Sequence, residues 1–506
     1  MSVQNAESTP ENTTPMERGL ILAVLTLVTA LYAMTITIAN VSLPQMQGAL
    51  SATTDQIALV VTFNIIATAV ATPMSGWLSA RFSRRTILIW GVGGFTVSSL
   101  LCGLATSLES LILFRIMQGA FGAPLAPISQ SIVMDHNPGE KRGPAIAIFG
   151  MGVIIGPVLA PTVGGILSEA YGWRWVFLMI VPFGIAAMVG VMIFVKRMGK
   201  RRVSYLDWSG FVLLSIFIAA FQFGLDRGER LDWFDSNTIL ICAAVAGLSF
   251  YLFIVHTITF DRPFLNPAIF KDRNYTLGCV IVFVFGMLNF TPMTLLPPML
   301  QFIQGYPDSV LGTILGARGV GTLIGFTFMF KGSKLDPRYT LSAGFLFQGI
   351  AGWYMSQFSV DFTLFDAIWT STLQGLGVGL IWVPLTIITF STLEEHYTTE
   401  ATAIFHLVRN FGSSIFISIS VAVALRTARI NYSELSANVS PFNDAMFYQA
   451  TMFGVWSFDT GKSLAGLSGE IYRQSAMIGY LNAFYLFAIL AFIVTPIAFL
   501  AKMKRK

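Results

Sequence analysis

The chain has 506 residues, of which 54% are hydrophobic and only 11% are charged, and its formal net charge is +5. A soluble protein carries about 25% charged residues, so this composition excludes a soluble globular protein and indicates a membrane protein with many spans. The three cysteines all lie in apolar runs, which is not the pattern of a disulfide framework or a metal cluster.

The start of the chain is polar over residues 1–17 and lacks the basic segment that opens a cleavable signal peptide. We therefore expect the first apolar run to stay in the protein as a membrane span. Fourteen apolar stretches have the length of a membrane-spanning helix. They lie at about residues 19–43, 56–79, 86–107, 110–134, 144–168, 174–195, 207–225, 236–257, 275–300, 310–331, 339–357, 364–391, 401–427 and 478–500.

The predicted fold is therefore all-α, with fourteen transmembrane helices. Most connections are short, but the polar and aromatic segment 428–477 is long, and the sequence is compatible with either amphipathic helices or a flexible loop there. Lys and Arg set the orientation. If the N-terminus is cytoplasmic, 21 of the 31 basic residues lie in inner segments and seven in outer ones. This bias predicts that both termini are cytoplasmic and that 428–477 lies outside.

The predicted spans divide into two six-helix bundles and an inserted pair. Short basic turns follow span 2, at 76–85, and span 10, at 331–338, which is a weak internal echo of the kind seen in transporters built from repeats. The predicted parts are a cytoplasmic tail (1–18), an N-terminal bundle (19–195), an inserted helix pair with its flanking loops (196–274), a C-terminal bundle that includes 428–477 (275–500) and a basic tail (501–506).

The fifth span, from Pro144 to Ser168, contains no charged residue. Small residues recur at every fourth position and form one ridge that lets a neighbouring helix approach closely. They are Gly152, Gly156, Ala160, Gly164 and Ser168. From spacing alone, a purely structural helix contact is as well supported as a transport function.

Three arginines lie inside predicted spans: Arg115, Arg318 and Arg409. A charge at the centre of a membrane helix costs ~3 kcal/mol or more, so each is a candidate functional residue. Each is also compatible with a structural clamp on backbone carbonyls, or, for Arg318 and Arg409, with a side chain that reaches the interface.

A proton carrier is harder to find, because no Asp or Glu lies near the middle of a predicted span. His406 is the only histidine well inside one, and imidazole exchanges protons near neutral pH. A packed structural histidine would look the same, and Asp366 could contribute if span 12 starts earlier. The spans hold no paired carboxylates, activated nucleophile or ATP-binding G-x-x-x-x-G-K-[ST] loop, so we expect neither an enzyme nor an ATP-driven pump.

Several stretches, in order along the chain, resemble motifs of the fourteen-span drug:proton antiporters of the major facilitator superfamily. They are Ala33–Pro44 in span 1, Gly76–Arg85 in the following loop, Arg115–Gly122 in span 4, Gly152–Gly165 (G-x-x-x-G-P-x-x-x-P-x-x-G-G) in span 5, Trp173–Gly184 at span 6, Leu225–Trp233 after span 7, and Arg409–Asn410 in span 13. Within this family the chain looks most like the EmrB-type multidrug exporters of Gram-negative bacteria.

This resemblance implies roles for particular residues. Proton coupling and gating fall to Arg115, Gln118, Gly152, Gly156, Pro157 and Gly164, to which we add His406. The loop motif comprises Gly76, Arg81, Arg84 and Arg85. The expected substrate cavity contains Asn40, Arg318, Trp382 and Arg409.

The resemblance also implies a function: proton-driven export of hydrophobic drugs or toxic compounds across the bacterial inner membrane. It implies a periplasmic adaptor similar to EmrA and an outer-membrane channel similar to TolC, with the proton as coupling ion and no other cofactor; nothing suggests nucleic-acid binding. Two alternatives stay open: a dedicated exporter of one endogenous metabolite, such as a siderophore or fatty acid, and a membrane sensor or scaffold that no longer transports.

Two positions depart from the family pattern. Thr35 and Ala80 stand where the family has aspartates. Thr35 cannot titrate, so coupling would need another group, and Ala80 leaves the basic loop without its usual acidic partner. Loss of a mid-membrane anion makes neutral or anionic substrates more plausible than strongly cationic ones, with the buried arginines as counter-charges.

Overall fold

The computed structural model describes residues 14–137, 141–196, 205–331, 336–394, 397–440, 442–443 and 461–500. Within these ranges the chain forms helices and no strand. The helices are α1 (Pro15–Val41), α2 (Leu43–Ala49), α3 (Thr54–Ala71), α4 (Met74–Arg81), α5 (Arg84–Leu104), α6 (Leu108–Gly122), α7 (Leu125–His136), α8 (Arg142–Tyr171), α9 (Trp175–Leu178), α10 (Ile180–Phe194), α11 (Trp208–Arg227), α12 (Asn237–Thr259), α13 (Arg273–Gln304), α14 (Asp308–Lys331), α15 (Pro337–Met355), α16 (Leu364–Thr389), α17 (Thr398–Ala437) and α18 (Gly461–Val494), with short 3-10 helices η3 (Glu229–Leu231), η4 (Trp233–Asp235), η5 (Pro267–Lys271) and η8 (Thr495–Leu500).

Each of the fourteen predicted spans falls on one of these helices or on a consecutive pair. Among the described residues, eleven helical segments are long and apolar enough to cross a membrane, and a twelfth span results if α3 and α4 count as one. This pair bends by 49° at Pro73, whose ring nitrogen has no hydrogen to donate to the helical ladder. Helices α8 and α15 occupy the other two predicted stretches, so the structure is compatible with fourteen spans.

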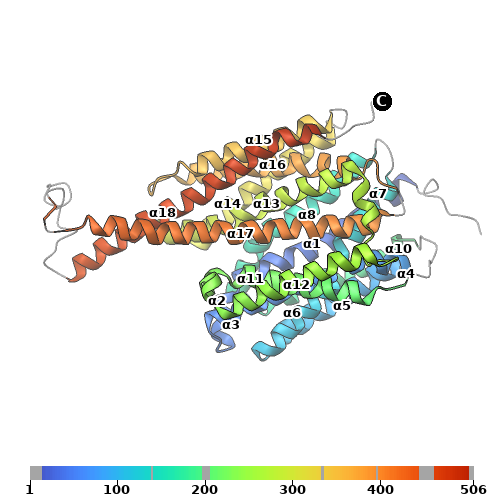
Figure 1. The fold of residues 1–506 in the computed structure, drawn as a ribbon, viewed down its shortest axis with the longest axis horizontal. Coiled ribbons are helices and arrows are strands. Elements are labelled where there is room, and N and C mark those ends of the chain that lie inside the picture. The colour runs from blue at the N-terminus through green and yellow to red at the C-terminus, as the bar shows by residue number, and fades with distance from the viewer. Residues whose placement is uncertain are drawn as a thin grey trace, which may run out of the picture.

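Two groups of helices pack side by side (Figure 1). We call α1–α10 the first half, α13–η8 the second half, and α11 with α12 the inserted pair. Direct contacts between the halves join α8 to α14 and α16, and α17 to α4 and α7. Helix α11 lies against both α3 and α17, whereas α12 packs chiefly on α11. The inserted pair therefore touches both halves through one helix.

The two ends of the bundle differ in shape. We call the end that holds Arg81 and Arg84 the basic end, and the opposite end the hairpin end, because α17 and α18 project there well past the other helices (Figure 1). Helix α17 has 40 residues, which makes it about 60 Å long, twice the ~30 Å of a hydrocarbon core.

The projecting hairpin answers the question that the sequence left open for 428–477. Residues 428–437 continue α17, since they contain neither glycine nor proline, and residues 461–477 belong to α18. The two helices meet where the hydroxyls of Tyr432 and Ser468 lie 2.9 Å apart. The tip, 444–460, lies outside the described residues.

Candidate functional site

A small cavity lies between the two halves, near the middle of the bundle. Helices α1, α7, α8, α13, α14, α16 and α17 contribute its walls. Its polar and aromatic lining includes Tyr32, Phe285, Asn289, Arg318, Trp382 and Arg409. Its volume is about 30 Å³, room for a few waters and not for a drug-sized molecule. The predicted cavity residues Arg318, Trp382 and Arg409, together with Pro157, thus share one site in a conformation closed around it. The side chain of Asn40 lies outside the described residues.

Arg318 is held in place from several sides. Its side chain is 2% exposed, and its Nη2 donates to the carbonyl oxygen and to Oδ1 of Asn289, at 2.6 and 2.9 Å. Its Nε donates to Gln374, which in turn donates to Gln348 over 3.0 Å. Neutral amides surround this guanidinium, so its positive charge is oriented but not neutralised by these partners.

Arg409 approaches the same cavity from α17 and is less completely bonded. Its guanidinium lies 5.7 Å from the ring centre of Trp382, and its Nη2 donates to Asn410 Oδ1 at 3.1 Å. Among the described residues, neither the buried Nε of Arg409 nor the buried Nε1 of Trp382 has a hydrogen-bond partner. Buried donors without acceptors are costly, so an acceptor brought by a ligand would be stabilised here.

Arg115 lies elsewhere, inside the first half. It is fully buried, and it donates to Gln118 Oε1 at 2.6 Å, to the carbonyl oxygen of Val60 at 3.3 Å and to that of Thr35 at 3.4 Å. Thr35 is the position where the family has an aspartate. The Nη2 of Arg115 has no hydrogen-bond partner among the described residues. Arg115 and Gln118 are therefore neighbours, as the motif implies, but the cavity lining does not include them.

His406 lies where α17 meets the first half. It is 2% exposed, and its Nε2 is 2.6 Å from Oε1 of Gln130 on α7. Its Nδ1 has no hydrogen-bond partner in the part of the chain that the structure describes. Its ring centre is 6.1 Å from that of Trp382. The imidazole thus joins the two halves next to the cavity.

The small-residue ridge of α8 packs against α1 within the first half. A Cβ added to Gly156 would lie 2.6 Å from the carbonyl oxygen of Ala30, and one on Gly164 would lie 2.7 Å from Ile38 Cγ1; Gly152 faces Thr26 equally closely. Pro157 presents its carbonyl oxygen to the Thr37 hydroxyl at 3.2 Å. The ridge therefore permits backbone contact between α1 and α8, which are both cavity helices.

The loop motif forms part of the basic end. Gly76 packs against α17, where an added Cβ would lie 3.1 Å from Glu400 Cβ and 3.2 Å from its Cα. Arg81 is exposed at the end of α4, and Arg85 donates to the carbonyl oxygen of Met192. Arg84 forms an ion pair with Asp135 of α7. The basic loop thus has an acidic partner despite Ala80, and it comes from a helix end about fifty residues later.

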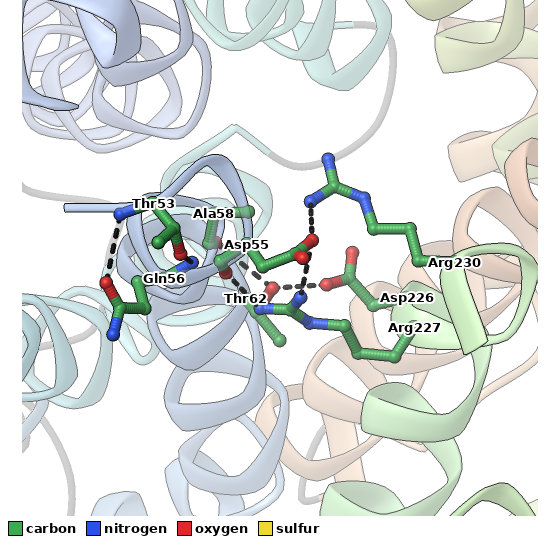
Figure 2. Close-up of polar contacts among 8 residues, drawn as sticks. All are labelled: Thr53, Asp55, Gln56, Ala58, Thr62, Asp226, Arg227 and Arg230. Carbon is green, nitrogen blue, oxygen red and sulfur yellow. Dashed lines mark hydrogen bonds and ion pairs between the residues drawn. The ribbon is translucent and has the colours of Figure 1, made fainter. Parts of the chain in front are cut away.

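The outer loop motif after span 7 forms a polar bridge at the hairpin end. Figure 2 shows Arg227 and Arg230 converging on Asp55 of α3, while Asp226 contacts Thr62. Arg227 Nη2 also donates to the carbonyl oxygen of Asp55 at 2.7 Å. On the other side, Glu229 lies 3.9 Å from Arg426 and 3.7 Å from Arg429 of α17. Residues 226–230 thus connect the first half to the second.

Sequence reasoning missed four residues that matter here: Tyr32, Gln130, Asn289 and Gln374. All are polar side chains within apolar spans. The only signal in the sequence was this position inside a stretch predicted to cross the membrane. Neutral polar side chains are common in membrane helices, however, so they do not stand out as the arginines do.

Comparisons with known proteins agree on one family. The sequence profile of the Major Facilitator Superfamily matches residues 25–417. The multidrug export protein EmrB of Haemophilus influenzae is 31% identical over 94% of this chain and 94% of its own, and the fatty acid resistance protein FarB of Neisseria gonorrhoeae is 32% identical over 92% of each. Among solved structures, the human organic anion transporter MFSD10 superposes with a TM-score of 0.56 over 95% of this chain and all of its own, at 11% identity, which supports the fold alone.

Proposed function

Because this chain belongs to the major facilitator superfamily, we propose that it exports hydrophobic compounds from a bacterial cell by alternating access, driven by protons that move inward. It is a membrane transporter of the EmrB type. The excess of Lys and Arg at the basic end supports an orientation in the inner membrane in which this end and both termini face the cytoplasm.

The observation that carries this proposal is the cavity between the halves. Arg409 and Trp382 line it beside Arg318 and the ring of Phe285, and each carries a buried donor without a partner among the described residues. Such a site suits an amphipathic anion, whose carboxylate would accept from Arg409 while its apolar body packs on the aromatic rings. The halves would rock apart to admit the compound, because the closed cavity holds only a few waters.

Proton coupling needs a group other than Thr35. His406 is our candidate carrier, since its Nε2 contacts Gln130 across the two halves and a change in its protonation would alter that contact. Arg115 would bias the site from inside the first half, and the ridge of α8 would keep α1 and α8 sealed against leak.

A second candidate function is export of one endogenous anion such as a fatty acid. The unpaired donors of Arg409 and Trp382 favour it, and FarB is named for fatty acid resistance. A broad drug panel separates the two: a dedicated exporter would move its own substrate and ignore the rest.

The transporter would act with a periplasmic adaptor and an outer-membrane channel. The projecting α17–α18 hairpin supports this proposal, because it extends well past the other helices on the side predicted to be periplasmic. A complex that survives purification with the adaptor, and is lost when 430–475 is replaced by a short turn, is the expected result.

The test of the main proposal is proton release from everted vesicles on addition of a substrate. Wild type should release protons with a lipophilic drug and with laurate. Arg115→Ala should release none, whereas Arg409→Gln should lose laurate-driven release by at least tenfold, because Arg409 faces the cavity. Arg262→Gln, an exposed loop arginine, is the matched control. Proton release unchanged in Arg115→Ala at equal expression would overturn the coupling scheme.

A further inference from the structure

A second cavity opens on the surface of the second half at the basic end. It has a volume of about 380 Å³ and is lined by Phe270, Arg273, Thr276, Leu277, Val280 and Leu500. These residues belong to η5, to the first two turns of α13 and to the last turn of η8. The groove is therefore separate from the central cavity, with which it shares no lining residue.

The walls of this groove are apolar and accessible. Phe270, Val280 and Leu500 are 42%, 49% and 56% exposed. In a membrane-spanning bundle, apolar side chains exposed at this level contact lipid rather than water.

One charged group stands at the mouth of the groove. Arg273 is exposed, and its Nη2 donates to the carbonyl oxygen of Leu500 at 3.3 Å, which places the guanidinium across the opening. A guanidinium has five N–H groups, so others remain for a ligand. Lys271 is exposed beside it. The acidic residue that precedes it in the sequence, Asp272, already accepts from the backbone amide of Tyr275 at 2.8 Å and caps α13.

The position of the groove along the membrane normal indicates which part of a lipid lies next to it. Arg273 is the first residue of α13, a span of 32 residues, so its guanidinium lies where the helix enters the membrane. The basic end is predicted to face the cytoplasmic leaflet, whose anionic headgroups attract clustered Lys and Arg. The groove therefore combines cations at headgroup level with apolar walls that continue toward the hydrocarbon.

We propose that this groove is a binding site for one anionic phospholipid. The headgroup phosphate accepts from Arg273 with Lys271 nearby, and an acyl chain lies along Phe270, Leu277 and Val280. Since η5 ends the linker from the inserted pair and η8 ends the last helix, the lipid fastens both to α13. This inference requires that the chain lies in a membrane with its basic end at the cytoplasmic leaflet, and it is independent of what the chain transports.

Thermal unfolding of the purified full chain in detergent tests this site. Dioleoylphosphatidylglycerol should raise Tm, whereas dioleoylphosphatidylcholine and inorganic phosphate should not. Arg273→Gln should lose most of that rise, and Arg262→Gln, which removes an exposed charge from a loop at the same end, should keep it. Tm without added lipid, together with gel-filtration elution, establishes that each variant is folded.

A second variant separates the groove from its charge. Thr276 is exposed, and Thr276→Trp would fill the groove with an indole ring while leaving Arg273 in place. This variant should also lose the increase in Tm on addition of phosphatidylglycerol. In native mass spectrometry it should retain one phosphatidylglycerol molecule fewer than wild type. The proposal is overturned if Arg273→Gln behaves like wild type, if both arginine variants lose the rise equally, or if free phosphate reproduces it.

Discussion

Different kinds of contact join the two halves at the two ends of the bundle. At the basic end they touch directly, with Gly76 against Glu400 and the Ser131 and Thr399 hydroxyls 3.1 Å apart. Farther in, Gly150 lies against Trp382, a residue that also lines the central cavity. At the hairpin end they are connected through the end of α11 and the following η3. Arg227 and Arg230 form ion pairs with Asp55 of α3 (Figure 2). Glu229 forms ion pairs with Arg426 and Arg429 of α17.

The difference predicts two kinds of sensitivity. Direct contact between small residues depends on side-chain volume, because close-packed interfaces do not absorb an added methyl group cheaply. The bridge depends on exposed charges, which contribute little individually and are screened by salt. An exporter that opens its ends in turn would therefore have one end controlled by shape and the other by charge.

The largest effect should come from a bulky residue at the direct contact. Gly150→Leu would drive its side chain into Trp382 and Phe326, since even a Cβ there would lie 2.6 and 2.9 Å from them. The two halves could then not close between the central cavity and the basic end, and we expect export of a fluorescent drug to fall at least tenfold. Gly143→Ala, whose Cβ would meet only Ile387 at 3.6 Å, should export normally. Equal export by both variants would mean that the direct contact is dispensable.

A milder change at the same end should give a smaller effect. Gly76→Ala requires Glu400 to yield by a few tenths of an ångström, so closure should weaken without being abolished. In a cysteine-free background with Ser131→Cys and Thr399→Cys, we expect disulfide formation to slow several-fold. Gly19→Ala, which has open space around it, should not change that rate. An unchanged rate in Gly76→Ala would show that the contact is looser than its geometry implies.

At the hairpin end, Arg227 should matter more than its neighbour Arg230. The Arg227 side chain is 9% exposed and that of Arg230 is 47% exposed. Arg227→Gln removes a buried charge-assisted bond to the Asp55 carbonyl and should cost about 1–3 kcal/mol of unfolding free energy. Arg230→Gln should cost about 0–1 kcal/mol. Thermal unfolding of the two variants should rank them, and the reverse order would contradict a bridge anchored by Arg227.

The smallest effect should come from the α17 side of the bridge. Arg426 and Arg429 are 59% and 63% exposed and lie 3.7–3.9 Å from Glu229, so replacing both with Gln should lower Tm only slightly at low salt. Raising the ionic strength to 1 M should lower the Tm of wild type toward that of the double variant, because salt screens the bridge. The difference in Tm between wild type and Gly76→Ala should not change with salt, because that contact involves no ion pair. A salt effect of equal size at both ends would remove the distinction.

The sequence predicted the helices well because apolar length is a strong signal in a membrane protein. All fourteen stretches are helical, and the break at Pro73 follows from its missing N–H. The sequence did not predict that α17 continues past residue 427. Residues 428–437 are polar and can form either a helix or a loop, and in the structure they are helical and contact α18.

The candidate site was predicted in part. Arg318 and Arg409 stood out because buried charge is expensive, and they do share the cavity with Trp382. Gln130 and Asn289 were missed because neutral amides carry no comparable cost. The ion pair between Arg84 and Asp135 joins residues that only the packing of α5 against α7 brings together, so no local pattern could reveal it.

Helix α17 has a mechanical consequence. One unbroken helix carries Glu400 at the basic end, Arg409 in the cavity, Arg426 at the bridge and Tyr432 in the projecting hairpin. Over a length of about 60 Å, a tilt of about 10° moves its far end by about 10 Å. If α17 tilted as one rigid body when the transporter opened, a movement of a few ångströms near the cavity would become a larger displacement of the hairpin, and a protein bound to the hairpin would sense which way the transporter faces.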